Sequence, residues 1–132
     1  MSKLLDTWAW IEFYDGTEIG QKIYSLIQGE EKLFTSEVTI AELSDNYHLG
    51  NFQTDHTWQQ VRGFIETNSE VLKIDSEIAS KAGKIKAEER KNKPDFGLMD
   101  ALILATARKK DLKLLTGDPH LTSQETAANL KK

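Results

Sequence analysis

Two kinds of hydrophobic pattern alternate along the chain. Short apolar runs of strand length are followed by longer segments in which apolar residues recur every three or four positions, the spacing of one helix face. The strand-like runs are residues 3–5, 32–35, 71–74 and 113–116. The helix-like segments are residues 8–28 with a turn at Asp15-Gly16, 36–50, 58–65, 76–90 and 98–110. This alternation predicts parallel strands joined by right-handed crossovers.

The expected fold class is therefore α/β, with helices on both faces of a central parallel sheet of four to five short strands. We expect residues 1–132 to form one domain, with a polar tail that frays after about residue 122. In such folds ligands bind beyond the carboxyl ends of the strands. Asp6 and Asp118 fall at two of those ends.

The composition is that of an ordinary soluble domain, with 39% hydrophobic and 29% charged residues. The chain has no cysteine, which excludes a disulfide framework, a thiolate zinc site and a cysteine nucleophile. No apolar run has the length of a signal peptide or of a membrane span. We therefore expect a cytoplasmic protein without a membrane partner.

Four acids stand in apolar or small surroundings: Asp6, Glu42, Asp100 and Asp118. Asp100 is the most telling, because it lies in the most apolar helical window, where an unpaired carboxylate would be costly. Converging carboxylates repel one another unless cations neutralise them, and Mg²⁺ and Mn²⁺ prefer carboxylate oxygens. The acids predict a metal site. Taken singly, Asp6 also fits a helix cap, Glu42 a solvated helix residue and Asp118 a turn residue.

These acids lie in segments that resemble the four acidic motifs of the PIN domain. The segments are Leu4-Leu5-Asp6-Thr7, Thr39-Ile40-Ala41-Glu42-Leu43, Asp100-Ala101-Leu102-Ile103-Leu104-Ala105-Thr106-Ala107 and Leu115-Thr116-Gly117-Asp118. Their order and spacing cover most of the chain, and its size is similar to that of VapC-type ribonuclease toxins. The resemblance implies a PIN-like three-layer α/β/α sandwich.

The resemblance also implies an endoribonuclease that cuts single-stranded RNA with one or two Mg²⁺ or Mn²⁺ ions. It makes Asp6, Glu42, Asp100 and Asp118 both catalytic and metal-binding, with Thr116 and, less specifically, Thr7 as supporting hydroxyls. Such a site activates a water for attack on phosphorus. By family precedent the cut leaves a 3′-hydroxyl and a 5′-phosphate. The implied partners are RNA, a cognate antitoxin protein and a second copy of the chain.

The net charge of −4 argues against RNA binding by a bulk positive field. Once four acids are assigned to the site, however, 17 acids remain to face 17 lysines and arginines. The strongest basic excess lies in residues 81–93. We predict that Lys86, Arg90, Lys91 and Lys93 guide RNA to the site. A solvated helix face is the alternative.

Other constellations give weaker signals. Asp95 is interpreted as an exposed loop residue in preference to a fifth acid, and Asp45, one helical turn from Glu42, also as exposed. His48, His56 and His120 lack paired metal-ligand spacing, so His120 is assigned to a turn or helix start. The glycines form no nucleotide-binding fingerprint.

Two other functions stay open. One is a PIN-like RNA-binding or regulatory module without turnover. The other is a phosphatase that uses Asp6 as nucleophile, although Trp8 stands where the phosphatase pattern has a second aspartate.

Overall fold

The computed structural model describes residues 2–124 and 127–130 of the chain. Its strands form one parallel sheet in the order β3-β2-β1-β4-β5. They are β1 (Lys3–Leu5), β2 (Leu33–Ser36), β3 (Glu70–Leu72), β4 (Lys113–Thr116) and β5 (Ala127–Asn129). The chain passes from β1 to β2 on one side and returns to β4 on the other. The carboxyl end of β1 is therefore the point where the strand order reverses, the usual ligand position in such sheets.

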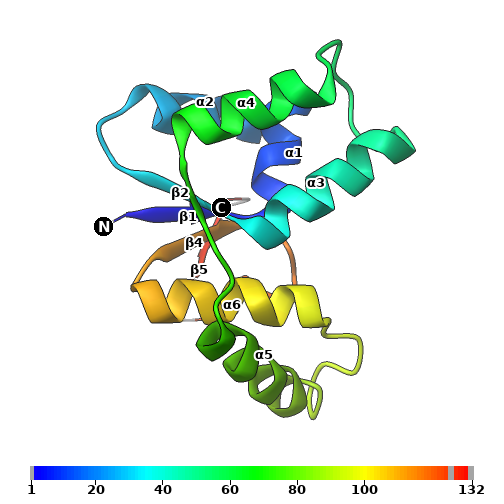
Figure 1. Ribbon diagram of the computed structural model, residues 1–132, viewed down its shortest axis with the longest axis vertical. Coiled ribbons are helices and arrows are strands. Elements are labelled where there is room, and N and C mark those ends of the chain that lie inside the picture. The colour runs from blue at the N-terminus through cyan, green and yellow to red at the C-terminus, as the bar shows by residue number, and fades with distance from the viewer. Residues whose placement is uncertain (1, 125–126, 131–132) are drawn as a thin grey trace.

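Helices cover both faces of this sheet (Figure 1). One layer holds α1 (Thr7–Asp15), α2 (Glu18–Gln28), α3 (Glu37–Leu49) and α4 (Trp58–Asn68). The opposite layer holds α5 (Ser76–Glu89) and α6 (Leu98–Lys110). The three-layer α/β/α sandwich predicted from the sequence is thus confirmed. Within the described residues, no helix is long and apolar enough to cross a membrane.

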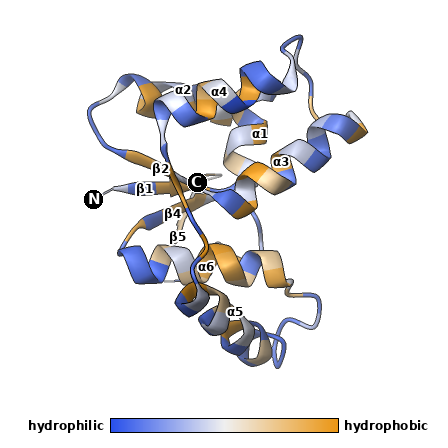
Figure 2. Cartoon of the chain, in the orientation of Figure 1, coloured by the Kyte–Doolittle hydropathy of each residue, from blue (hydrophilic) through white to orange (hydrophobic). Residues whose placement is uncertain are grey.

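Each central strand supplies both hydrophobic cores. Successive strand side chains point to opposite faces, so Leu4 packs into the core under α5 and α6, and Leu5 into the core under α1–α4. Leu114 and Leu115 of β4 divide in the same way. This double burial explains why the strands are continuous apolar runs. Figure 2 shows α6 largely hydrophobic up to its basic C-terminal end, as a core helix requires.

The local signals in the sequence mark the helix ends. Gly16 adopts a left-handed conformation, with φ of 69°, and separates α1 from α2 at the expected turn. Asp6 caps α1 by accepting a hydrogen bond from the Ala9 N–H at 2.9 Å. The capping interpretation of Asp6 is therefore correct, and it fixes this carboxylate at the end of β1.

The described part of the C-terminal segment differs from the frayed tail expected after about residue 122, whereas residues 125–126 and 131–132 of that tail lie outside the described residues. Residues 127–129 pair with β4 as the parallel edge strand β5, in the register Leu114↔Ala127. Ala128 and Leu130 pack against the core on the α1–α4 side. The run Ala-Ala-Asn carries no β-branched or aromatic residue, so its strand signal is weak in the sequence.

Candidate metal site

The carboxyl edge of the sheet brings together the four acids predicted from the sequence. Asp6 follows β1, Asp118 follows the neighbouring β4, Glu42 projects from α3, and Asp100 lies in the first turn of α6. Their charges act on one another: Asp118 and Glu42 raise the pKa of Asp6, and Asp118 also raises the pKa values of Glu42 and Asp100. The four side chains therefore form one acidic cluster.

Asp6 is the most deeply buried member, with 4% of its surface exposed. Burial raises its pKa to about 7, although hydrogen bonds from the Thr116 side chain and the Ala9 N–H lower it. The nearby charges of Asp118 and Glu42 contribute to the same rise. Asp6 is therefore held in a place where its charged form is destabilised unless a cation approaches.

The two predicted hydroxyl residues each contact acids of the cluster. The fully buried Thr116 bonds the Asp6 carboxylate, and its Oγ1 accepts the Asp118 N–H at 3.0 Å. Thr7 donates from Oγ1 to Glu42 Oε1 at 2.6 Å. The Glu42 pKa is nevertheless raised, mainly by burial. The hydroxyls thus hold the carboxylates of Asp6 and Glu42 and the backbone of Asp118.

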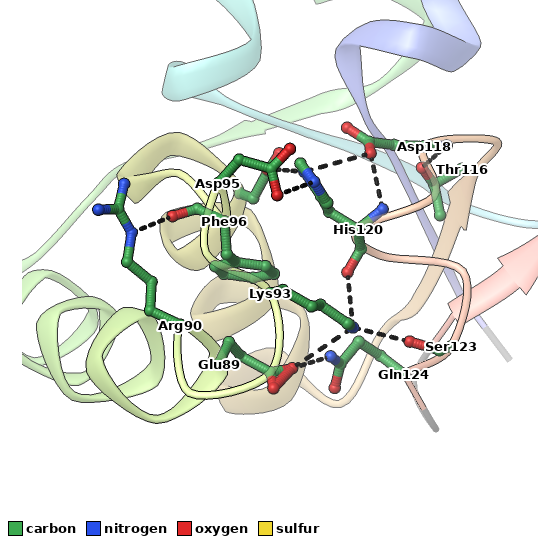
Figure 3. A network of polar contacts seen from close by, with 11 residues as sticks. Glu89, Arg90, Lys93, Asp95, Phe96, Thr116, Asp118, His120, Ser123 and Gln124 are labelled. Carbon is green, nitrogen blue, oxygen red and sulfur yellow. Dashed lines mark hydrogen bonds and ion pairs between the residues drawn. The ribbon is translucent and has the colours of Figure 1, made fainter.

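A histidine that the sequence analysis assigned to a turn also lies in this site (Figure 3). His120 places Nδ1 3.3 Å from Asp100 Oδ2 and 3.9 Å from Asp118 Oδ1, and Nε2 3.1 Å from Asp95 Oδ1. Burial lowers the His120 pKa, but these carboxylates more than offset it, so the pKa is raised. Its position two residues after the last acid was the one available signal.

Asp95 and Asp45 are both exposed, as expected. Asp95 nevertheless meets His120, although 80% of its side chain is exposed. The loop interpretation of Asp95 is therefore incomplete, because this loop residue reaches the edge of the acidic cluster.

The predicted RNA-guiding residues divide into two pairs. Arg90 donates from Nε to the Phe96 carbonyl at 2.8 Å. Lys93 Nζ lies 3.3 Å from the His120 carbonyl and 2.9 Å from Ser123 Oγ (Figure 3). These two side chains therefore hold the loop before α6 in place. Lys86 is half-buried on α5, and Lys91 is exposed within that loop.

The donor set fits a hard divalent cation. Carboxylate oxygens dominate the cluster, and one ligand atom from each of Asp100, Asp118 and His120 can be chosen within 4.8 Å of one another. The pKa values of Asp6, Glu42 and Asp100 are all raised, mainly by burial, with neighbouring acids adding to the effect. A cation would relieve this repulsion, as expected for a metal site.

Gly117 makes room for the Trp8 ring that packs against it. A Cβ at this position would lie 2.4 Å from Trp8 Cζ2, too close for two carbon atoms. We expect Gly117→Ala to cost about 1–3 kcal/mol in the free energy of unfolding, because the Trp8 ring or the turn to Asp118 must shift. Gly63→Ala on α4 is the control, since nothing lies within 4 Å of a Cβ there. Equal stability of the two variants in urea unfolding would contradict this packing argument.

The fold and the acidic edge define a class of α/β protein with a carboxylate site at the strand ends. The model of the PIN domain matches residues 3–125, and the chain belongs to the PIN domain family. A search of curated proteins finds no match.

Solved structures share this fold. A toxin-antitoxin complex from Klebsiella pneumoniae aligns with a TM-score of 0.76 and 22% identity over 98% of each chain. VapBC2 from Rickettsia felis, bound to a DNA fragment from its promoter, aligns with a TM-score of 0.74 and 16% identity over 98% of each chain. VapC20 of Mycobacterium tuberculosis, a toxin that cleaves the sarcin-ricin loop, aligns with a TM-score of 0.64 and 18% identity over 85% of each chain.

Proposed function

We propose that this chain is a divalent-metal-dependent endoribonuclease and the VapC-type toxin of a toxin-antitoxin pair. The observation that carries the proposal is the cluster of four acids at the carboxyl edge of the sheet, where burial and mutual repulsion call for a cation. Each acid stands in the segment that resembles a PIN motif. The likeness to VapC20, a toxin that cleaves the sarcin-ricin loop, supports RNA as the substrate.

In this proposal Asp6, Glu42, Asp100 and Asp118 hold one or two Mg²⁺ or Mn²⁺ ions. A bound ion supplies a Lewis acid for the phosphate and lowers the pKa of a bound water. Thr116 holds Asp6 and Asp118 in place, and Thr7 holds Glu42. The protein thereby aligns its carboxylates before substrate arrives, and it needs no side-chain nucleophile for phosphodiester hydrolysis.

Partners follow from the same reasoning. Toxin-antitoxin complexes among the structural neighbours support a cognate antitoxin for this chain. We also propose that Lys86 and Lys91, with Arg90 and Lys93 beside them, attract the RNA backbone toward the acids. The homodimer and the cytoplasmic location stay predictions from the resemblance and the sequence.

RNA cleavage with matched variants tests the nuclease. Purified protein is expected to cut a labelled single-stranded RNA with Mn²⁺ or Mg²⁺ and to stop in EDTA. Asp100→Asn should lower the rate by about a thousandfold or more, since it removes a carboxylate from the site. Asp45→Asn makes the same chemical change at an exposed position and should keep full activity.

The alternatives give different results in the same assay. Metal-independent RNA binding without cutting, on several RNAs and with antitoxin excluded, would favour the regulatory module. Turnover of small phosphorylated molecules, but not of RNA, would favour the phosphatase.

A further inference from the structure

His120 sits against the acidic cluster in a geometry that suits a shared ion. Its Nδ1 is 3.3 Å from Asp100 Oδ2 and 3.9 Å from Asp118 Oδ1. Ligand atoms about 2.1 Å from one octahedral ion lie roughly 3 to 4 Å apart. The spacing of these three side chains therefore matches three ligands of one ion, with a nitrogen among the oxygens.

The ring and the backbone of His120 are each held by neighbouring residues. Asp95 Oδ1 lies 3.1 Å from Nε2, and the His120 N–H donates to Asp118 Oδ1 at 2.9 Å. The His120 carbonyl accepts a hydrogen bond from Lys93 Nζ at 3.3 Å. In Figure 3 these contacts join the loop before α6 to the turn after β4. Metal-bound histidines commonly direct their second ring N–H at such a carboxylate, which fixes the tautomer and the ring plane.

The contact between His120 Nδ1 and Asp100 Oδ2 is a hydrogen bond in the metal-free structure, and it needs a ring proton because a carboxylate oxygen only accepts. A divalent cation that binds Nδ1 together with the oxygens of Asp100 and Asp118 would displace that proton, as metal binding to histidine generally does. The hydrogen bond therefore marks a place where a cation can replace a proton among three electron-rich atoms.

We propose that His120 Nδ1 is a nitrogen ligand of the divalent ion at the acidic site, that Asp95 is its positioning residue, and that the site therefore prefers Mn²⁺ to Mg²⁺. The preference follows because imidazole binds first-row transition metals well, whereas Mg²⁺ favours oxygen ligands and retained water. The inference rests on the proposed function, since it concerns the same metal site.

Pulsed electron paramagnetic resonance on the Mn²⁺-loaded full chain detects such a ligand directly. The wild-type protein should show coupling between Mn²⁺ and a nitrogen nucleus, and labelling histidine with nitrogen-15 should change that coupling. His120→Asn should remove it. His48→Asn is the matched control, because His48 lies exposed on α3 with its Nδ1 beside the Ser44 carbonyl at 2.7 Å. Bound Mn²⁺ without histidine coupling in the wild type would overturn the inference.

Calorimetric titration with Mn²⁺ and with Mg²⁺ tests the preference. His120→Asn should weaken Mn²⁺ binding by about tenfold or more and change Mg²⁺ binding much less. Asp95→Asn should weaken Mn²⁺ binding by up to about tenfold while the nitrogen coupling persists, as expected of a positioning residue. Equal losses for both metals in His120→Asn would overturn the Mn²⁺ preference.

These measurements separate the inference from the proposed function. Metal-dependent RNA cleavage without histidine coupling would leave the nuclease intact and refute the role of His120. Absence of any Mn²⁺ binding in the wild type would refute both.

Discussion

Replacing Asp6 by asparagine is expected to stabilise the metal-free protein at about pH 8, although the variant should lose RNA cleavage. Burial raises the Asp6 pKa to about 7, so at that pH the native state holds a charged carboxylate with little solvent. Asparagine removes the charge and remains a good helix cap for the Ala9 N–H. The expected gain in the free energy of unfolding is up to about 4 kcal/mol, because the pKa is raised by about three units and each unit corresponds to about 1.4 kcal/mol.

The sign of the pH dependence follows from proton binding. The Asp6 pKa is raised from 3.8 to about 7 in the folded state, so the folded protein binds more protons than the unfolded chain between these values. The stability of the wild type should therefore fall as the pH rises through this window, and stay reduced above it. Burial also raises the pKa values of Glu42 and Asp100, so part of the slope should remain in Asp6→Asn.

Thermal unfolding in EDTA at about pH 5 and pH 8 measures both effects. We expect Asp6→Asn to melt on the order of 10 °C above the wild type at the higher pH, with a much smaller difference at the lower one. Asp45→Asn, at an exposed position, should follow the wild type at both. A variant no more stable than the wild type at pH 8 would show that the buried charge is already compensated.

Most of the fold follows from patterns that are local in the sequence. Leu4 and Leu5 belong to a short run that the sheet buries on both faces, and such a run predicts a parallel strand. The pair Asp15-Gly16 likewise predicts the turn at which Gly16 adopts its left-handed conformation. The strand β5 escaped prediction because an Ala-Ala-Asn run gains its conformation from pairing with β4, which no local pattern records.

In the candidate site, too, local patterns predicted some residues, and tertiary packing alone brings in the others. Asp6 and Asp118 could be predicted because each follows a strand, and Asp100 because a carboxylate is conspicuous in an apolar helix. His120 and Asp95 could not, because they are 25 positions apart and meet only when the loop before α6 packs against the turn after β4. Tertiary packing, not residue type, makes them neighbours.

Thr116→Val is expected to weaken both Mn²⁺ binding and RNA cleavage by about 10- to 100-fold. The Thr116 side chain is fully buried, bonds Asp6 and accepts the Asp118 N–H, so valine fills nearly the same space but leaves both acids without this partner. The Asp6 pKa should rise further, because the Thr116 hydrogen bond lowers it. The acidic limb of the pH–activity profile should then move to higher pH.

Thr116→Ser is the control that separates the hydroxyl from the packing. Serine keeps the hydrogen-bonding oxygen and loses a methyl group, so it should retain most of the metal affinity and the wild-type pH profile while costing some stability. Valine should weaken metal binding and shift the pH profile. It should also lower the free energy of unfolding by about 1–3 kcal/mol, because the Asp118 N–H loses its hydrogen-bond acceptor. If serine impaired metal binding as much as valine, the methyl contacts of Thr116, and not its hydroxyl, would be what aligns Asp6 with Asp118.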